Sequence, residues 1–142
     1  MEPYHIDRTA LEHFCTHVFI ALGLSEEEAV DSSEILVSAD ARGIASHGVA
    51  RLWRYENGLR LGIMSGGIQP TILRETPISL VLDANGAMGM SLSRKTMDQV
   101  IEKAKVSGVG FASIRNSNHF GIAGYYSEMA ARSDMIGIAM TN

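Results

Sequence analysis

The feature that most constrains the fold is an alternation of strand and helix patterns in the second half of the chain. Residues 78–83 and 109–114 have strand patterns, residues 91–107 and 121–132 have helix patterns, and residues 135–141 form a third, continuously apolar strand pattern. Such an alternation is typical of helices packed on a sheet. A strand that is apolar along its whole length is expected to be buried on both faces. The pattern therefore predicts an α/β domain.

The glycine fingerprint of a doubly wound, dinucleotide-binding sheet is absent from this region. That fingerprint, G-x-G-x-x-G, lies between a strand and the helix that follows it. Gly86 and Gly89 match it only in part, and Gly108 and Gly110 lead into a strand rather than a helix. The residues alone therefore leave the direction of the strands open.

The first part of the chain has helix patterns. The first predicted helix spans residues 7–22, and its apolar stripe is expected to be buried: Leu11, Phe14, Cys15, Val18, Phe19 and Leu22. A second helix follows a capping box at Ser25–Glu28. A third begins with Ser46 as its N-cap. The arc of the third helix that is expected to pack on the core consists of Val49, Leu52, Trp53 and Leu59.

Length and composition are those of a folded domain. A chain of 142 residues can bury one ordinary core. With 46% hydrophobic and 20% charged residues, the composition is globular. Residues 62–70 have loop composition. They are expected to separate a helical region, residues 1–70, from the first part of an α/β region, residues 71–142.

Charge, apolar runs and cysteine content bear on the expected partners and location of the chain. The net charge is −4 and Lys and Arg do not cluster, which argues against nucleic acids and anionic membranes as partners. No apolar run approaches the roughly 20 residues that span a bilayer. Cys15 is the only cysteine and is expected to be a core residue, so no disulfide framework is predicted. Because the N-terminus does not resemble a signal peptide, the expected location is the cytoplasm.

The third predicted helix presents a proton-transfer group, a cation and a phenol on one face. His47, Arg51 and Tyr55 follow one another at i, i+4 and i+8. An imidazole can accept or donate a proton near neutral pH, and a guanidinium can hold a carboxylate with two parallel hydrogen bonds. This set suits a small anionic substrate. Tyr55 could hydrogen-bond the substrate or orient His47. The alternatives are a surface ion pair of Arg51 with Glu56 or a neighbour, and a Tyr55 that is merely half-buried at the helix surface.

His119 is a second candidate for proton transfer. It ends a polar connection, residues 116–119, between a predicted strand and a predicted helix, and such loops often carry function. The alternative is an ordinary helix cap by Ser117 or Asn118, with His119 in solvent. Whether His47 or His119 would move a proton is left open.

No metal site is predicted. His13 and His17 are four residues apart but lack further ligands, so a solvated helix face is expected. A metal-dependent hydrolase built on His47, His119 and an aspartate has no recognisable ligand spacing.

Two separated motifs resemble a known family. SHGVARLWRY at residues 46–55 and RNSNHFGIAGYYSEMAA at residues 115–131 are similar to the two N-terminal signatures of the malate/L-lactate dehydrogenase family. This family lacks a Rossmann domain and includes ureidoglycolate, sulfolactate and 2,3-diketogulonate oxidoreductases. The resemblance implies an α/β, or α+β, fold: a helical hairpin region followed by a mixed, largely antiparallel sheet with helices. Family members are usually more than twice this long, so the fold is expected to be incomplete.

The resemblance also implies a function. The activity would be an NAD(P)-dependent oxidoreductase of malate or lactate type that interconverts a 2-oxo acid and a 2-hydroxy acid, with NAD or NADP as cofactor. The residues implied are His47 and His119 for catalysis, Ser46, Arg51 and Tyr55 for substrate, and Asn118, Thr141 and Asn142 for cofactor. A homodimer or larger homo-oligomer is implied as well. The alternative is a non-catalytic, truncated fragment that associates with itself or with a complementary chain.

Overall fold

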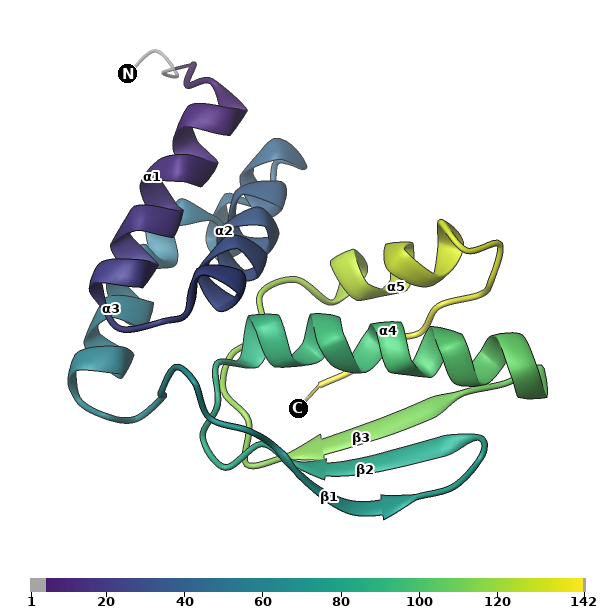
Figure 1. The fold of residues 1–142 in the computed structure, drawn as a ribbon. Helices are drawn as coiled ribbons and strands as arrows, with labels where there is room; N and C mark the ends of the chain where they lie inside the picture. The colour runs from purple at the N-terminus through teal and green to yellow at the C-terminus, as the bar shows by residue number, and fades with distance from the viewer. Residues whose placement is uncertain (1–4, 142) are drawn as a thin grey trace.

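The computed structural model describes residues 5–141, over which the chain forms helices, two short 3₁₀ turns and a three-stranded sheet. The elements are α1 (Arg8–Ala21), α2 (Glu26–Ala41), η1 (Ala45–His47), η2 (Val49–Arg51), α3 (Leu52–Arg60), β1 (Thr71–Glu75), β2 (Ser79–Asp83), α4 (Gly89–Ser107), β3 (Phe111–Arg115) and α5 (Ala123–Ala131). In Figure 1, α1, α2 and α3 gather at one end of the molecule, and α4 and α5 lie over the sheet.

The first two helices begin where their caps predict. The Asp7 side chain caps α1. The capping box of α2 is complete, because the Ser25 N–H donates to the Glu28 carboxylate at 3.0 Å and the Glu28 N–H donates to the Ser25 hydroxyl at 3.3 Å. The same carboxylate accepts the N–H of Gly67 at 2.9 Å. It therefore also fixes the loop that leads from α3 to the sheet.

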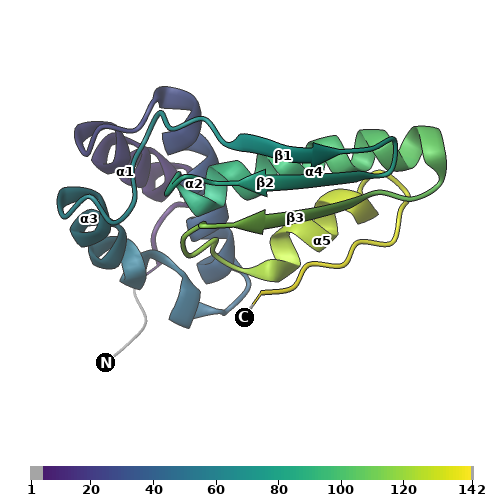
Figure 2. The same ribbon diagram turned by 90° about the horizontal axis from the view of Figure 1, so that it is seen from below.

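The sheet is mixed, which confirms the predicted fold class. The strand order is β1-β2-β3, with β1 antiparallel to β2 and β2 parallel to β3. The helix α4 forms the crossover between the two parallel strands. Figure 2 shows α4 and α5 behind one face of the sheet. The strand β1 is not predicted by the sequence, because its five residues are all exposed and carry no alternation of buried and solvated positions.

The predicted strand at residues 135–141 is wrong. This segment is not assigned to a strand, and Ile136, Ile138 and Met140 are 95%, 72% and 85% exposed. Every second side chain is partly covered, as on an extended segment with one face on the protein. The segment does not join the sheet, which consists of β1, β2 and β3, so its apolar composition does not lead to a buried strand.

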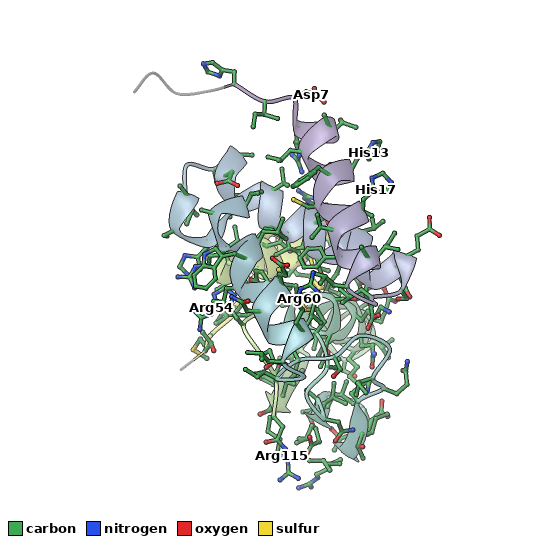
Figure 3. The ribbon with its side chains drawn as sticks, turned by 90° about the vertical axis from the view of Figure 1, so that its left-hand side faces the viewer. Asp7, His13, His17, Arg54, Arg60 and Arg115 are labelled. Carbon is green, nitrogen blue, oxygen red and sulfur yellow. The ribbon has the colours of Figure 1, made fainter. Side chains whose placement is uncertain are left out.

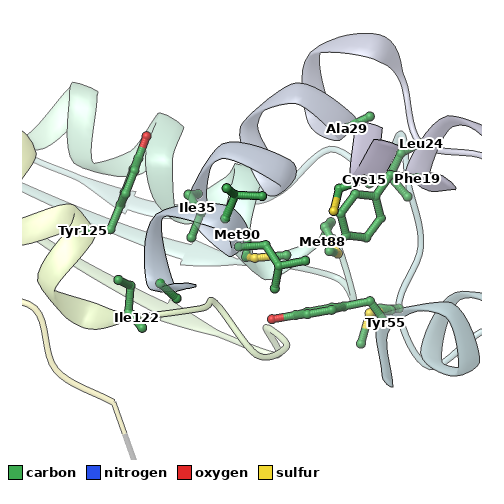
Figure 4. Close-up of a cluster of buried hydrophobic side chains, with 14 of the residues drawn as sticks. Cys15, Phe19, Leu24, Ala29, Ile35, Tyr55, Met88, Met90, Ile122 and Tyr125 are labelled. Carbon is green, nitrogen blue, oxygen red and sulfur yellow. The ribbon is translucent and has the colours of Figure 1, made fainter. Parts of the chain in front are cut away.

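Most buried hydrophobic side chains belong to one cluster that joins the helices. It includes Cys15, Phe19, Ile35, Leu36, Tyr55, Met88, Met90 and Tyr126 (Figure 4). The cluster confirms Cys15 as a core residue and draws on residues before and after position 70. A second, smaller cluster lies where the sheet meets α4: Leu80, Leu82, Ala84, Ala87 and Leu92. The division at residue 70 stays a prediction.

Two residues expected in the core are on the surface. Phe14 is 56% exposed because α1 packs through Cys15 and Phe19. Trp53 is 63% exposed, whereas Tyr55 on the same helix is 1% exposed. The orientation of α3 therefore differs from the expected one, and it brings the Tyr55 ring into the core cluster in place of the indole.

Candidate functional site

The segment that carries His47 is a pair of 3₁₀ turns rather than the start of α3. Ser46 is not the N-cap of α3, which corrects the prediction; its hydroxyl lies 2.9 Å from Nδ1 of His47. Gly48 has an extended backbone, with φ −90° and ψ −156°, and this conformation interrupts the helix. The N–H of Val49 instead donates to the Asp40 carboxylate at 2.7 Å. The turn is therefore fixed by a side chain of the preceding helix.

Gly48 lies close to the side chain of Asp40, so a larger residue there would displace the Asp40 carboxylate. A Cβ atom there would lie 2.0 Å from an Asp40 carboxylate oxygen. The neighbouring Arg42 forms an ion pair with Glu128 on α5. Both contacts hold the turn that carries His47 against the rest of the molecule.

His47, Tyr55 and His119 converge from three separate segments. The rings of His47 and His119 stack, with centroids 5.5 Å apart and an interplanar angle of 26°. The Tyr55 hydroxyl lies 2.6 Å from Nδ1 of His119. The sequence pattern placed His47 and Tyr55 on one helix face and left His119 apart. In the structure His119 is the residue that contacts both.

The connection that carries His119 is held from its other side. The Asn118 side-chain amide donates to the carbonyls of Gly86 and Ala87 at 3.0 and 3.1 Å. The Asn116 side-chain amide donates to the Asp83 carboxylate at 2.9 Å. The N-cap position of α5 is Ile122 and has no side-chain cap, so neither Ser117 nor Asn118 caps this helix. The polar residues of the connection fix the loop itself.

Burial and positive charge keep His119 neutral. Burial, followed by the charges of Arg51, His47 and Arg54, lowers the pKa of His119 to about 4. Burial also raises the pKa of the Tyr55 hydroxyl well above its ordinary value, although Arg51 and Arg54 oppose this shift. At neutral pH the site therefore holds an uncharged imidazole and a protonated phenol.

Arg51 lies at the same turn with its terminal guanidinium nitrogens unpaired. Its Nε donates to the carbonyl of Ser46. Within residues 5–141 it forms no ion pair, because Glu56 pairs with Arg60 at 3.0 Å. Arg54 also forms no ion pair among these residues. Figure 3 shows Arg54 and Arg60 on different sides of α3.

A groove of about 880 Å³ runs between α4, β3 and the segment 135–141. Its lining includes Met97, Val100, Ile101, Ser117, Asn118, Phe120, Ile136 and Thr141. Two of the three predicted cofactor contacts, Asn118 and Thr141, thus lie on one groove. The third, Asn142, lies outside the described residues.

Two glycines that shape the site are missed by sequence reasoning. The Gly121 N–H donates to Nδ1 of His119 at 3.3 Å. A Cβ on Gly89, at the start of α4, would lie 2.4 Å from the Asn118 carbonyl oxygen and 2.8 Å from that of His119. The pattern considers Gly89 only as part of a dinucleotide fingerprint. An isolated glycine at a helix start can also indicate a close backbone approach, and that signal could have found it.

The described residues also show where the histidines of α1 lie and how metal binding and membrane crossing stand. His13 and His17 are exposed on α1 (Figure 3). Between residues 5 and 141, no three His, Cys, Asp or Glu side chains are arranged to hold a metal ion. Over the same range, none of the helices combines the length and apolar character that crossing a membrane requires.

Comparisons with known proteins identify relatives of the whole described region. The model of the malate/L-lactate dehydrogenase family matches residues 6–142. The malate/(S)-sulfolactate dehydrogenase of Methanothermus fervidus is 48% identical over 124 residues, which are 86% of this chain and 36% of that protein. The malate dehydrogenase of Pyrococcus abyssi is 46% identical over 141 residues, or 96% of this chain and 38% of that protein. The chain thus spans just over a third of these relatives.

A solved structure shares the fold as well as the sequence. The malate dehydrogenase of Pyrococcus horikoshii superposes with a TM-score of 0.87 at 37% identity, covering 93% of this chain and 40% of that one. The helical end, the mixed sheet and its covering helices therefore recur in a dehydrogenase of known structure.

Proposed function

The chain belongs to the malate/L-lactate dehydrogenase family, and on this premise we propose that it forms part of an NAD(P)-dependent oxidoreductase that interconverts a 2-oxo acid and a 2-hydroxy acid. The observation that carries the proposal is the convergence of His47, Tyr55 and His119 beside Arg51, which has no carboxylate partner within residues 5–141. Malate and sulfolactate, which the relatives' names specify, are the first substrates to test.

Proton transfer is assigned to an imidazole of this pair. In the oxidative direction the C2–H bond breaks, a C2=O double bond forms, and the hydroxyl proton leaves to a base. The nicotinamide cofactor, when bound, accepts the hydride. His47 or His119 receives the proton, since both lie in one stacked pair at the site. The reverse direction returns a proton from the same group to the alkoxide oxygen.

The substrate carboxylate is assigned to Arg51. Because its Nε is bonded to the Ser46 carbonyl, the plane of the guanidinium is fixed while both terminal nitrogens keep their donors. Two parallel N–H bonds to a carboxylate supply orientation as well as attraction. Arg54 adds positive charge nearby, as its effect on the pKa of His119 shows.

NAD or NADP is assigned to the side of the site where Asn118 and Thr141 line the groove. The donor set fits a carboxamide, because the Asn118 amide nitrogen is bonded to backbone carbonyls and its side-chain oxygen keeps acceptor capacity. Asn118 would hold the nicotinamide carboxamide, and Thr141 and Asn142 would add polar contacts.

The proposal is tested by binding and turnover. Intact mass of the protein made from its natural gene defines the chain to be assayed. Fluorescence titration with NADH and NADPH then measures cofactor binding, and a panel of 2-hydroxy acids measures turnover with each oxidised cofactor. Saturable binding with oxidation of at least one acid supports the proposal. An absence of binding at millimolar cofactor contradicts it.

Arg51→Lys is expected to raise KM for the oxo acid about tenfold with a smaller change in kcat, because one bond of the bidentate pair, worth about 1.4 kcal/mol, is lost. Arg60→Lys is the matched control, since Arg60 lies on α3 and pairs with Glu56 rather than facing the two histidines. Steady-state kinetics of both variants checks the prediction. An unchanged KM in Arg51→Lys would remove Arg51 from the carboxylate site.

A second proposal is that the chain acts by association, as a non-catalytic partner of itself or of a complementary chain. Large apolar side chains are exposed along the sheet and the segment 135–141: Ile72, Leu73, Phe111, Ile136, Ile138 and Met140. Such a surface is typical of an interface. Sedimentation equilibrium tests it, and a monomer that binds NADH would favour the dehydrogenase alone. Self-association together with cofactor binding would match the homo-oligomer that the family likeness implies.

A further inference from the structure

We propose that Tyr55 is a positioning residue that, together with the backbone amide of Gly121, fixes neutral His119 as the tautomer with its proton on Nε2. Both groups approach the same ring nitrogen. The Tyr55 hydroxyl oxygen lies 2.6 Å from Nδ1 of His119, and the Gly121 nitrogen lies 3.3 Å from it. The tautomer follows from what each group is able to donate.

A backbone amide can only donate a hydrogen bond. Nδ1 therefore offers its lone pair to the Gly121 N–H and carries no proton of its own. The Tyr55 hydroxyl shares that lone pair as a second donor, and its raised pKa keeps the phenolic proton in place. The proton of the neutral imidazole is left on Nε2.

The surroundings of His119 favour the neutral ring on which this depends. Burial is the main cause of its lowered pKa of about 4, and electrostatic interactions with Arg51, His47 and Arg54 lower it further. These groups come from η1, η2 and α3, and the acidic Glu56 of α3 is paired with Arg60. The imidazole is therefore uncharged at neutral pH.

Tyr55 acts through His119 rather than on the substrate. Its side chain is buried, with the ring packed edge-on against Phe19 at a centroid distance of 6.0 Å. Figure 4 shows it within the core cluster. This step rests on the proposed function: His119 presents Nε2–H to the substrate oxygen and polarises that oxygen by hydrogen bonding. Because Nε2 already carries a proton and Nδ1 faces Tyr55 and Gly121, His47 is the histidine left to receive the hydroxyl proton.

The test is the nitrogen spectrum of the His119 ring in the uniformly ¹⁵N-labelled chain at pH 7, with no cofactor or substrate. A pyridine-type signal at Nδ1 and a pyrrole-type signal at Nε2 are expected. The opposite pattern, with the proton on Nδ1, would overturn the proposal. Because the measurement needs no turnover, it can fail while the proposed dehydrogenase function stands, and the reverse also holds.

The contribution of the phenol is tested with Tyr55→Phe, which keeps the ring in the core. Loss of one hydrogen bond to Nδ1 is expected to lower the preference for the Nε2–H tautomer about tenfold, so that the two ring signals move towards an average. Tyr125→Phe is the matched control, since the Tyr125 hydroxyl donates to Glu34 rather than to His119. Identical His119 spectra in Tyr55→Phe and the unsubstituted chain would show that Tyr55 does not position this ring. The spectrum of the unsubstituted chain remains decisive if the variant does not fold.

Discussion

Gly89→Ala is expected to destabilise the chain by about 2 kcal/mol and to displace the connection that carries His119. The added Cβ would lie 2.4 Å from the Asn118 carbonyl oxygen and 2.8 Å from the His119 carbonyl oxygen. These are backbone atoms and cannot rotate away, so either α4 or the loop has to shift. Urea denaturation of the 142-residue chain measures the loss of stability.

Helix propensity acts in the opposite direction and makes this a sharp test. Alanine is favoured over glycine by about 1 kcal/mol in a helix interior and by less in the first turn, where Gly89 and Gly124 both lie, so a first-turn site with free space would be slightly stabilised. Gly124→Ala on α5 supplies that control, because nothing lies within 4 Å of the Cβ position there. The two variants are expected to change stability in opposite directions. Equal stabilisation by both would show that α4 and the His119 connection are not in close contact.

The parts of the fold that sequence reasoning predicts well are those that a local pattern marks. The capping box joins Ser25 to Glu28, three residues away, and it forms as predicted. The strand β1 pairs with β2, which follows it directly, but all five of its residues are exposed and no alternation marks it, whereas the segment 135–141 is apolar and does not join the sheet. Composition alone therefore missed the exposed strand β1 and predicted a buried strand at residues 135–141, which the structure does not have.

The site shows the same limit at the level of single residues. Helical periodicity placed His47, Arg51 and Tyr55 on one face, but the extended backbone at Gly48 breaks that helix. The contact between Tyr55 and His119 spans 64 positions, so no local pattern predicts it. The local patterns offered His47 and His119 as separate candidates, and only the resemblance assigned both to one catalytic site. Which of them carries the proton depends on the tautomer of each ring, and no sequence pattern indicates that tautomer.

A second large effect is expected in the polar network that joins α2, α4 and α5. Arg94 lies 2.6 Å from the Glu34 carboxylate and 3.3 Å from that of Asp31. Ser91 donates to Asp31 at 2.8 Å, and the Tyr125 hydroxyl donates to Glu34 at 3.0 Å. One guanidinium thus lies within ion-pair distance of two carboxylates.

Arg94→Met is expected to cost about 2 kcal/mol at pH 7, below the 3–5 kcal/mol of a fully buried pair because Arg94 and Glu34 are partly solvated. Lys95→Met is the matched control. Its partner Glu27 is exposed, and the change is expected to stay within about 0.5 kcal/mol. Denaturation midpoints of the two variants at pH 7 measure the difference. Equal, small losses would show that Arg94 is no more important than a surface cation.

The pH dependence separates lost charge from lost packing. Burial raises the pKa of Asp31 despite the hydrogen bond from Ser91 and the charge of Arg94. Protonation of Asp31 at acid pH therefore favours the folded chain over the unfolded one. Burial also opposes ionisation of Glu34, but the hydrogen bonds and charge from Arg94 and Tyr125 outweigh burial and lower the pKa of Glu34. The ionised Glu34 therefore stabilises the folded chain at neutral pH, and this stabilisation is lost as the pH falls. Without Arg94 both carboxylates hold their protons more tightly in the folded chain. The stability difference between the unsubstituted chain and Arg94→Met should therefore be largest at pH 7 and shrink towards pH 4. A difference that stays constant with pH would instead assign the loss of stability to packing of the Arg94 side-chain stem.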